Sequence, residues 1–124
     1  MEMKIRIYYE DTDAGVIVYH TNYIKYCERA RSEEFFSRGI RPLYESSGFV
    51  VRDIEASFLA TATLGDMIEV RSSMIELKRS SLWLLQEIYK ADELIFRMKI
   101  KLVYISRQRP IRIPQEYLEL FEEL

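Results

Sequence analysis

The sequence predicts an α+β fold in which an antiparallel sheet wraps around one long central helix, with a short helix at the C-terminus. Two observations lead to this prediction: residues 23–38 carry apolar side chains at helical spacing, and the chain after Gly48 alternates between apolar and polar residues. A sheet of antiparallel strands packed against a separate helix is an α+β arrangement. With 124 residues and no internal repeat or linker, the chain is expected to form a single domain over residues 1–124.

The N-terminal part is expected to hold one strand and the long helix. Residues 3–9 alternate as a half-buried strand does, and one side of that strand holds Met3, Ile5, Ile7 and Tyr9. After an acidic loop, Asn22 is placed to cap a helix over residues 23–38, and Gly39 fits the position just past its end. The inner stripe of this helix is expected to include Tyr23, Cys27 and Ala30.

The rest of the chain predicts the sheet. Four successive antiparallel strands are expected over residues 49–59, 67–77, 81–89 and 96–102. One face of the first of them is expected to hold Val50, Ile54, Ala56 and Phe58. The third is apolar on both faces, which is typical of a strand that is covered on both sides, and its second face holds Trp83, Leu85 and Tyr89. Pro114 suits the first position of a short C-terminal helix.

Composition and charge exclude several classes of function. The net charge is −2, so there is no basic field that would attract nucleic acid. No apolar run approaches the ~18 residues needed to cross a bilayer, and residues 1–6 are too charged for a signal peptide. Cys27 is the only cysteine and His20 the only histidine, so neither a disulfide nor a metal site is expected. We therefore expect a cytoplasmic protein without a membrane span, a metal or another cofactor.

The most informative stretch runs from Tyr8 to Tyr23, between the first strand and the helix. It holds Asp11 and Asp13 two residues apart, and His20 just before the expected helix start. A carboxylate beside a helix N-terminus supplies what acyl transfer needs, namely a base or nucleophile and backbone N–H groups for a developing oxyanion. Aspartates ahead of a helix are also common as capping residues, so the residue types alone leave both roles open for Asp13.

This stretch resembles the signature of the 4-hydroxybenzoyl-CoA thioesterase family, and within it the YbgC-like branch of acyl-CoA thioesterases associated with the Tol–Pal cell-envelope system. The similar residues are Tyr8-Tyr9-Glu10-Asp11-Thr12-Asp13, then Val18-Tyr19-His20, then Tyr23 and Glu28-Arg29-Ala30-Arg31. The resemblance implies the hot-dog fold, in which a sheet wraps around a central helix. It also implies a homo-oligomer, a dimer or a dimer of dimers (a homotetramer), with active sites at the subunit interface.

The resemblance assigns a role to each candidate residue. Asp13 corresponds to the catalytic carboxylate of the family, acting as base or nucleophile, and backbone N–H groups near His20 correspond to the oxyanion donors. His20 is expected to position water, to donate to the carbonyl or to protonate the leaving thiolate. The residues expected to bind substrate are Tyr9, Val16 and Tyr19 in the walls of the site, and Lys78, Arg79 and Ser80 in a turn that corresponds to the basic turn contacting the nucleotide in relatives.

Two positions depart from the family pattern. Members usually carry glycine three residues after the catalytic aspartate, where this chain has Val16, and the glycine here is Gly15. The loop is therefore expected to follow a slightly different path. A proline that is common in relatives is replaced by Thr61, which bears on loop rigidity rather than on chemistry.

The expected reaction is hydrolysis of a small or medium acyl-CoA to the free acid and CoA, with acyl carrier protein as an alternative carrier of the acyl group. A non-catalytic acyl-CoA-binding or scaffold protein for envelope or lipid-synthesis partners is one alternative, and a hot-dog dehydratase of hydroxyacyl thioesters is another. Asp11 is expected to order the loop through backbone hydrogen bonds. Cys27 is expected to be a small buried hydrophobe rather than a nucleophile.

Overall fold

The structure, a computed structural model, describes residues 2–124. The elements are β1 (Glu2–Arg6), a 3₁₀ turn η1 (Tyr9–Asp11), α1 (His20–Phe36), β2 (Leu43–Tyr44), β3 (Ser47–Phe58), β4 (Met67–Leu77), β5 (Ser81–Lys90), β6 (Glu93–Ser106), β7 (Arg109–Pro110) and α2 (Gln115–Glu122). Neither helix of this part of the chain is long and apolar enough to span a bilayer.

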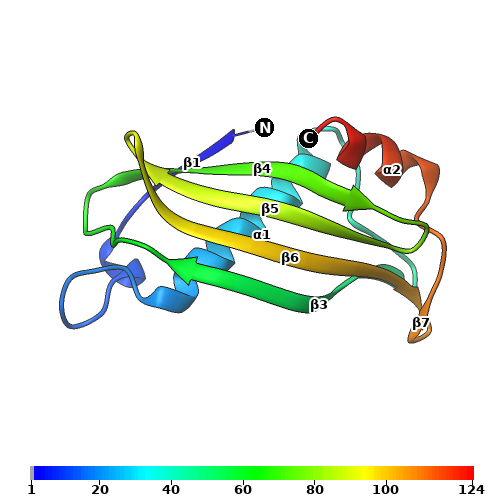
Figure 1. The fold of residues 1–124 in the computed structure, drawn as a ribbon, viewed down its shortest axis with the longest axis horizontal. Coiled ribbons are helices and arrows are strands. Elements are labelled where there is room, and N and C mark those ends of the chain that lie inside the picture. The colour runs from blue at the N-terminus through cyan, green and yellow to red at the C-terminus, as the bar shows by residue number, and fades with distance from the viewer. Residues whose placement is uncertain (1) are drawn as a thin grey trace.

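The strands form one antiparallel sheet that curls around α1 (Figure 1). The strand order is β1-β4-β5-β6-β3-β2, with β7 paired to β6. The four long strands predicted from the sequence are present, but β3 and β4 are not neighbours, because β3 pairs with β6 and β4 lies between β1 and β5. A curled antiparallel sheet around one long helix, with a short helix at the end, confirms the predicted α+β hot-dog architecture.

The core lies between α1 and the concave face of the sheet. From α1 the side chains of Tyr23, Cys27 and Ala30 are buried, as their spacing predicted. The Tyr23 ring stacks on Phe96 of β6 with the centroids 5.5 Å apart. The buried sheet residues alternate along β5 and β6, as predicted, and include Leu82, Leu84, Ile88, Met98, Ile100 and Leu102.

The start of α1 differs from the prediction. The helix begins at His20 rather than at residue 23, and Tyr19 rather than Asn22 occupies the N-cap position. Asn22 lies inside the first turn, where its backbone N–H donates to the Tyr19 carbonyl at 2.8 Å. The Asn22 side-chain amide donates to the Asp11 carbonyl at 2.9 Å, so it fastens the preceding loop to the helix instead of capping the helix.

The end of α1 follows the prediction closely. Gly39 has φ +69°, and its N–H donates to the Phe36 carbonyl at 3.0 Å, while the Ile40 N–H reaches back to Phe35 at 3.0 Å. These two bonds around a left-handed residue form a Schellman motif, which satisfies the last carbonyls of the helix. Glycine suits this position because it has no Cβ to oppose a positive φ.

In strand β3, one residue lies on the other face of the sheet from the one predicted. The register against β6 shifts between Val51 and Asp53, where a bulge inserts one extra residue. Val50 pairs with Val103, whereas Ile54 pairs with Ile100 on the opposite, concave face. The predicted grouping of Val50 with Ile54, Ala56 and Phe58 is therefore wrong for Val50, because the bulge reverses the alternation.

Strand β1 is shorter than predicted. It ends at Arg6 instead of residue 9, and the chain then turns through η1. Ile7 is buried as expected, but Tyr9 is 75% exposed in the turn and does not continue the inner face of the strand. The turn forms because the Asp11 carboxylate accepts the Tyr8 N–H at 2.8 Å, a local bond that competes with strand pairing.

Candidate active site

The loop that carries Asp13 is closed by backbone hydrogen bonds at its base. Asp13 N–H donates to the Ile17 carbonyl at 2.9 Å, and Thr12 forms a bridge with Val18. Val18 N–H then donates to the Ala62 carbonyl at 2.9 Å, which fixes the loop against the connection between β3 and β4. The position of Asp13 is thus set by main-chain contacts on both sides of the loop.

The Asp13 carboxylate is exposed and has one hydrogen-bond partner within the described chain. Its Oδ1 accepts the Gly15 N–H at 2.8 Å. A Cβ at position 15 would lie 3.3 Å from that oxygen, so the absence of a side chain at Gly15 lets the backbone approach the carboxylate closely. The second oxygen, Oδ2, has no partner among residues 2–124 and is open to a ligand or water.

Val16 takes a left-handed conformation, which favours glycine, the residue expected at this position from the family resemblance. Its φ is +64°, a left-handed value that is unusual for any residue with a Cβ and rarer for a β-branched one. Gly15 itself has no positive φ. The loop therefore makes a turn at Val16 that glycine would adopt without strain, and Val16 is under backbone strain.

The N-terminus of α1 lies next to this loop. Tyr19 makes no side-chain capping bond, and its own N–H donates to the Asp11 carbonyl at 3.0 Å. The N–H groups of His20 and Thr21 have no acceptor within residues 2–124. Unpaired N–H groups and the helix dipole at this end favour negative charge, as on the oxygen of a carbonyl under attack.

His20 is the first residue of α1 and is exposed. Its ring lies 4.6 Å from the Tyr19 ring and meets Phe58 of β3 edge-on at 5.8 Å. These aromatic contacts fix the ring at the helix start, beside the C-terminal end of β3. The predicted residues Asp13, Val16, Tyr19 and His20 thus belong to one loop and one helix start.

Several exposed apolar side chains surround this loop. Tyr9, Val16 and Tyr19, all predicted to bind substrate, are 75%, 45% and 48% exposed, and Phe58 and Leu59 at the end of β3 are also exposed. Tyr23 is different, because it is buried and its hydroxyl oxygen accepts the Ala62 N–H at 3.0 Å. Tyr23 therefore joins α1 to the β3–β4 connection and is a structural residue.

The predicted nucleotide-binding turn is not near Asp13 in the same chain. Lys78, Arg79 and Ser80 join β4 to β5 at the opposite end of the sheet from the Asp13 loop (Figure 1). At 3.3 Å per residue, the 11-residue strand β4 separates the two ends by roughly 33 Å. Lys78 forms an ion pair with Glu76 at 3.2 Å, and the Arg79 carbonyl accepts the Ile113 N–H at 2.9 Å.

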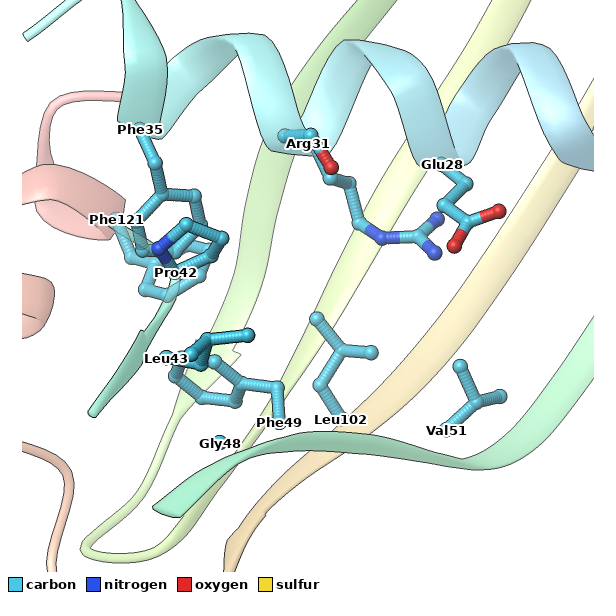
Figure 2. Close-up of a pocket in the computed structure, with 11 residues that line it drawn as sticks. Glu28, Arg31, Phe35, Pro42, Leu43, Gly48, Phe49, Val51, Leu102 and Phe121 are labelled. Atoms are coloured by element: carbon cyan, nitrogen blue, oxygen red, sulfur yellow. The ribbon is translucent and has the colours of Figure 1, made fainter. Parts of the chain in front are cut away.

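A pocket opens beside the C-terminal half of α1 and was not predicted from the sequence. It has a volume of about 320 Å³, a size typical of small-molecule sites. Figure 2 shows Glu28 and Arg31 of α1 above it and an apolar group at one end. Its apolar lining comes from Phe35, Pro42, Leu43, Phe49, Val51, Leu102 and Phe121.

Arg31 is held in this pocket by a buried amide. Its Nη1 donates to Oε1 of Gln86 at 2.8 Å. Gln86 is fully buried in β5, and its own amide nitrogen donates to the Cys27 carbonyl and to Oγ of Ser72, at 2.9 and 3.0 Å. Burial lowers the pKa of the Arg31 guanidinium from its usual range. A sequence signal for this residue does exist, because position 31 continues the apolar stripe of Cys27 at a spacing of four.

Cys27 does not take part in a site. It is fully buried, and burial raises the pKa of its thiol to about 12, so it holds its proton at neutral pH. This agrees with the expectation of a small buried hydrophobe. Within residues 2–124 there is no group of three or more side chains suited to bind a metal ion.

Comparison with known proteins gives one consistent family. Residues 8–121 match the family model described as "Thioesterase-like superfamily". The acyl-CoA thioesterase YbgC of Helicobacter pylori is 41% identical, over 98% of this chain and 100% of the relative. The 4-hydroxybenzoyl-CoA thioesterase of a Pseudomonas species is 26% identical over 95% of this chain and 94% of the relative.

A solved structure supports the same fold. A hypothetical protein of Aquifex aeolicus superimposes with a TM-score of 0.89 at 25% identity, over 98% of each chain. The superimposed 98% of this chain includes the Asp13 loop, α1 and the sheet.

Proposed function

The chain belongs to the thioesterase-like superfamily and to its YbgC-like branch, and from this premise we propose that it is an acyl-CoA thioesterase. It hydrolyses the thioester of a small or medium acyl-CoA to the free acid and CoA. The observation that carries the proposal is the exposed Asp13 carboxylate, fixed in a loop beside a helix N-terminus with unpaired N–H groups.

The thioester carbonyl oxygen points at the start of α1. There the N–H groups of His20 and Thr21 stabilise the negative charge that develops when the carbonyl is attacked. Asp13 acts through Oδ2, because Oδ1 is engaged by Gly15. It either attacks the carbonyl carbon to form an anhydride that water then hydrolyses, or takes a proton from a water that attacks directly. In both routes the C–S bond breaks and CoA leaves as the thiolate, which takes up a proton.

His20 has a supporting role in this mechanism. Its ring is exposed at the helix start, held by Tyr19 and Phe58, where it can protonate the departing thiolate or hold a water. The exposed side chains of Tyr9, Val16 and Tyr19 form walls around the thioester.

A second copy of the chain completes the site in this proposal. Within residues 2–124, strand β3 has an unpaired edge beyond Gly48, and its concave face is exposed at Ile54 and Phe58. Two such edges pair antiparallel about a two-fold axis, because an isologous contact uses the same strand twice. The Phe58 end of β3 in one copy then lies beside the Phe49 end in the other.

This pairing brings the two halves of a site together. Phe58 contacts His20 of the same chain, and Phe49 lines the pocket that contains Arg31. Asp13 and His20 of one copy therefore face the pocket of the other. The turn formed by Lys78, Arg79 and Ser80 of the second copy comes to the same end of the assembly, where it can meet the phosphates of CoA.

Asp13→Asn tests the proposal. Asparagine retains an oxygen for the Gly15 N–H but has neither the charge nor the basicity of the carboxylate, so the loop is expected to persist. We expect kcat/KM for thiol release from acyl-CoA to fall at least a hundredfold, which corresponds to ~2.7 kcal/mol of transition-state stabilisation. The free energy of unfolding is expected to stay unchanged.

Asp11→Asn is the matched control. It makes the same chemical change two residues away, on a carboxylate that is engaged with the Tyr8 N–H, and we expect kcat/KM to fall less than fivefold. Equal activity of wild type and Asp13→Asn would remove Asp13 from the mechanism. Binding of acyl-CoA without any thiol release would instead favour the non-catalytic binding or scaffold protein.

A further inference from the structure

Arg31 lies part-buried in a pocket with a largely apolar lining, where the charge of Glu28 acts on it but no ion pair forms within residues 2–124. Arg31 has one hydrogen bond within residues 2–124, from Nη1 to Gln86, and it makes no ion pair there. Its Nε and Nη2 groups, which lie on one edge of the guanidinium, have no protein acceptor within the described chain. Moving a guanidinium partly out of water has a cost, and the charge of Glu28 offsets it only in part, since the pKa of Arg31 stays lowered by burial. A charge whose desolvation is incompletely offset is typical of groups that await a ligand.

The guanidinium is also held in place before any ligand arrives. Gln86 uses its oxygen for Arg31 and its nitrogen for Cys27 and Ser72, so the fully buried amide cannot turn without losing these bonds. Preorganisation of this kind reduces the entropy lost when a ligand binds. The support comes from β4, β5 and α1 together, which are rigid elements of the fold.

The surroundings define the chemistry of the ligand. One end of the pocket is apolar, through Phe35, Phe49 and Phe121, and suits methylene groups (Figure 2). The free edge of Arg31 presents two N–H directions in parallel, which match the two oxygens of a carboxylate. Glu28, on the preceding turn, is the acid in the lining and is exposed to solvent.

We propose that Arg31 selects acyl groups that end in a carboxylate, so that the preferred substrates are the CoA thioesters of short dicarboxylic acids. This inference rests on the proposed thioesterase function and on the completed site of two copies. His20 and Arg31 of the same helix are roughly 16 Å apart at 1.5 Å per residue, which is too far for one short acyl group to span. The carboxylate therefore binds Arg31 of one copy while the thioester lies at Asp13 of the other.

Matched substrate pairs test the selection. Glutaryl-CoA is compared with pentanoyl-CoA, and adipyl-CoA with hexanoyl-CoA, because each pair differs in a terminal carboxylate in place of a methyl group. For wild type we expect kcat/KM to be at least tenfold higher for the dicarboxylic member of a pair. Methionine has an apolar side chain of similar length. In Arg31→Met we expect the ratio of kcat/KM for the dicarboxylic member to kcat/KM for the alkyl member to fall at least a hundredfold.

Three further variants sharpen the test. Arg31→Lys keeps the charge but not the two parallel donors, so the ratio is expected to fall about tenfold. Glu28→Gln removes the negative charge from the pocket, and the ratio is expected to rise. Lys25→Met removes an exposed positive charge of the same helix outside the pocket lining, and the ratio is expected to stay within twofold of wild type.

The outcomes separate this inference from the proposed function. Hydrolysis of the alkyl thioesters at least as fast as the dicarboxylic ones by wild type would overturn the inference and leave the thioesterase intact. A loss of activity in Arg31→Met that is equal for both members of a pair would also overturn it, since that pattern indicates a structural role. No thiol release from any of the four thioesters would overturn the proposed function itself.

Discussion

At the scale of single residues, Val16 shows how the Asp13 loop accommodates a departure from its family. The family pattern puts glycine at this position, and the backbone there has φ +64°. A left-handed conformation costs an ordinary L-residue about 1–2 kcal/mol, through contact between Cβ and the following carbonyl oxygen. The backbone hydrogen bonds of Asp13 and Val18 fix the base of the loop and hold Val16 in this conformation.

Val16→Gly is expected to stabilise the protein. Glycine relieves the strain at φ +64° but loses about 0.5–1 kcal/mol in backbone entropy, so we expect a net gain of about 0.5–1 kcal/mol in the free energy of unfolding. Urea denaturation measures this change. Val16→Ala is the control, because it keeps the Cβ and should show little gain. A loss of stability in Val16→Gly would indicate that the Val16 side chain packs against another copy.

The candidate residues near Asp13 were predicted from the sequence, whereas the proposed role of Arg31 was not. The motif places Asp13, Val16, Tyr19 and His20 within eight residues, so local chain geometry is enough to keep them together. The role of Arg31 depends on Gln86, which is 55 residues away in the sequence and on a different element. Only the packing of α1 on β5 brings these two side chains into contact.

At the scale of elements, the end of α1 was predictable and its start was not. Gly39 ends the helix through a local backbone preference that no distant contact needs to support. The start depends on the Asn22 side chain, which bonds the Asp11 carbonyl 11 residues earlier and so frees the cap position for Tyr19. The face of the sheet on which Val50 lies was unpredictable for a similar reason, because the bulge in β3 arises from pairing with β6.

Gly39→Ala is expected to destabilise the protein by about 1 kcal/mol, because alanine must take the left-handed conformation at φ +69°. A Cβ at this position would meet no atom within 4 Å, so the cost is one of backbone conformation alone. Thermal or urea unfolding gives the value. Gly48→Ala is the matched control, since its φ is not left-handed and its Cβ would make an ordinary contact with Leu43 at 3.6 Å. Equal effects of the two substitutions would contradict this explanation.

At the scale of the whole molecule, the residues of the proposed site lie at opposite ends of α1 and the sheet. Asp13 and His20 lie at one end of α1, whereas the pocket with Arg31 and the turn with Lys78 lie toward the other. The sequence predicted Asp13, His20 and the turn with Lys78, but it did not predict the pocket with Arg31. It also could not give the distance between the two groups of residues. That separation is a property of the sheet and helix lengths, and it makes a second copy necessary for the proposed chemistry.

Ile54→Lys is expected to give a monomer with little thioesterase activity. Ile54 is 41% exposed on the concave face of β3, at the centre of the proposed contact, and two lysines would meet there across the two-fold axis. Sedimentation velocity distinguishes a dimer, or a dimer of dimers, from the 14.9 kDa chain. Ser73→Lys, an exposed position of β4, is the control and should leave the assembly intact. A wild-type protein that sediments only as a monomer would contradict the shared site.

The free edge of β3 also affects the chain before it has met another copy. A long strand with open N–H and C=O groups and apolar side chains accepts almost any extended peptide, including the same strand in a wrong register. The proposed dimer covers this edge, so newly made chains are expected to be exposed to aggregation until two copies pair, and chaperones that shield extended segments are expected to act in that interval. Production at low temperature, where correct pairing competes better with misassembly, is expected to raise the yield of folded protein.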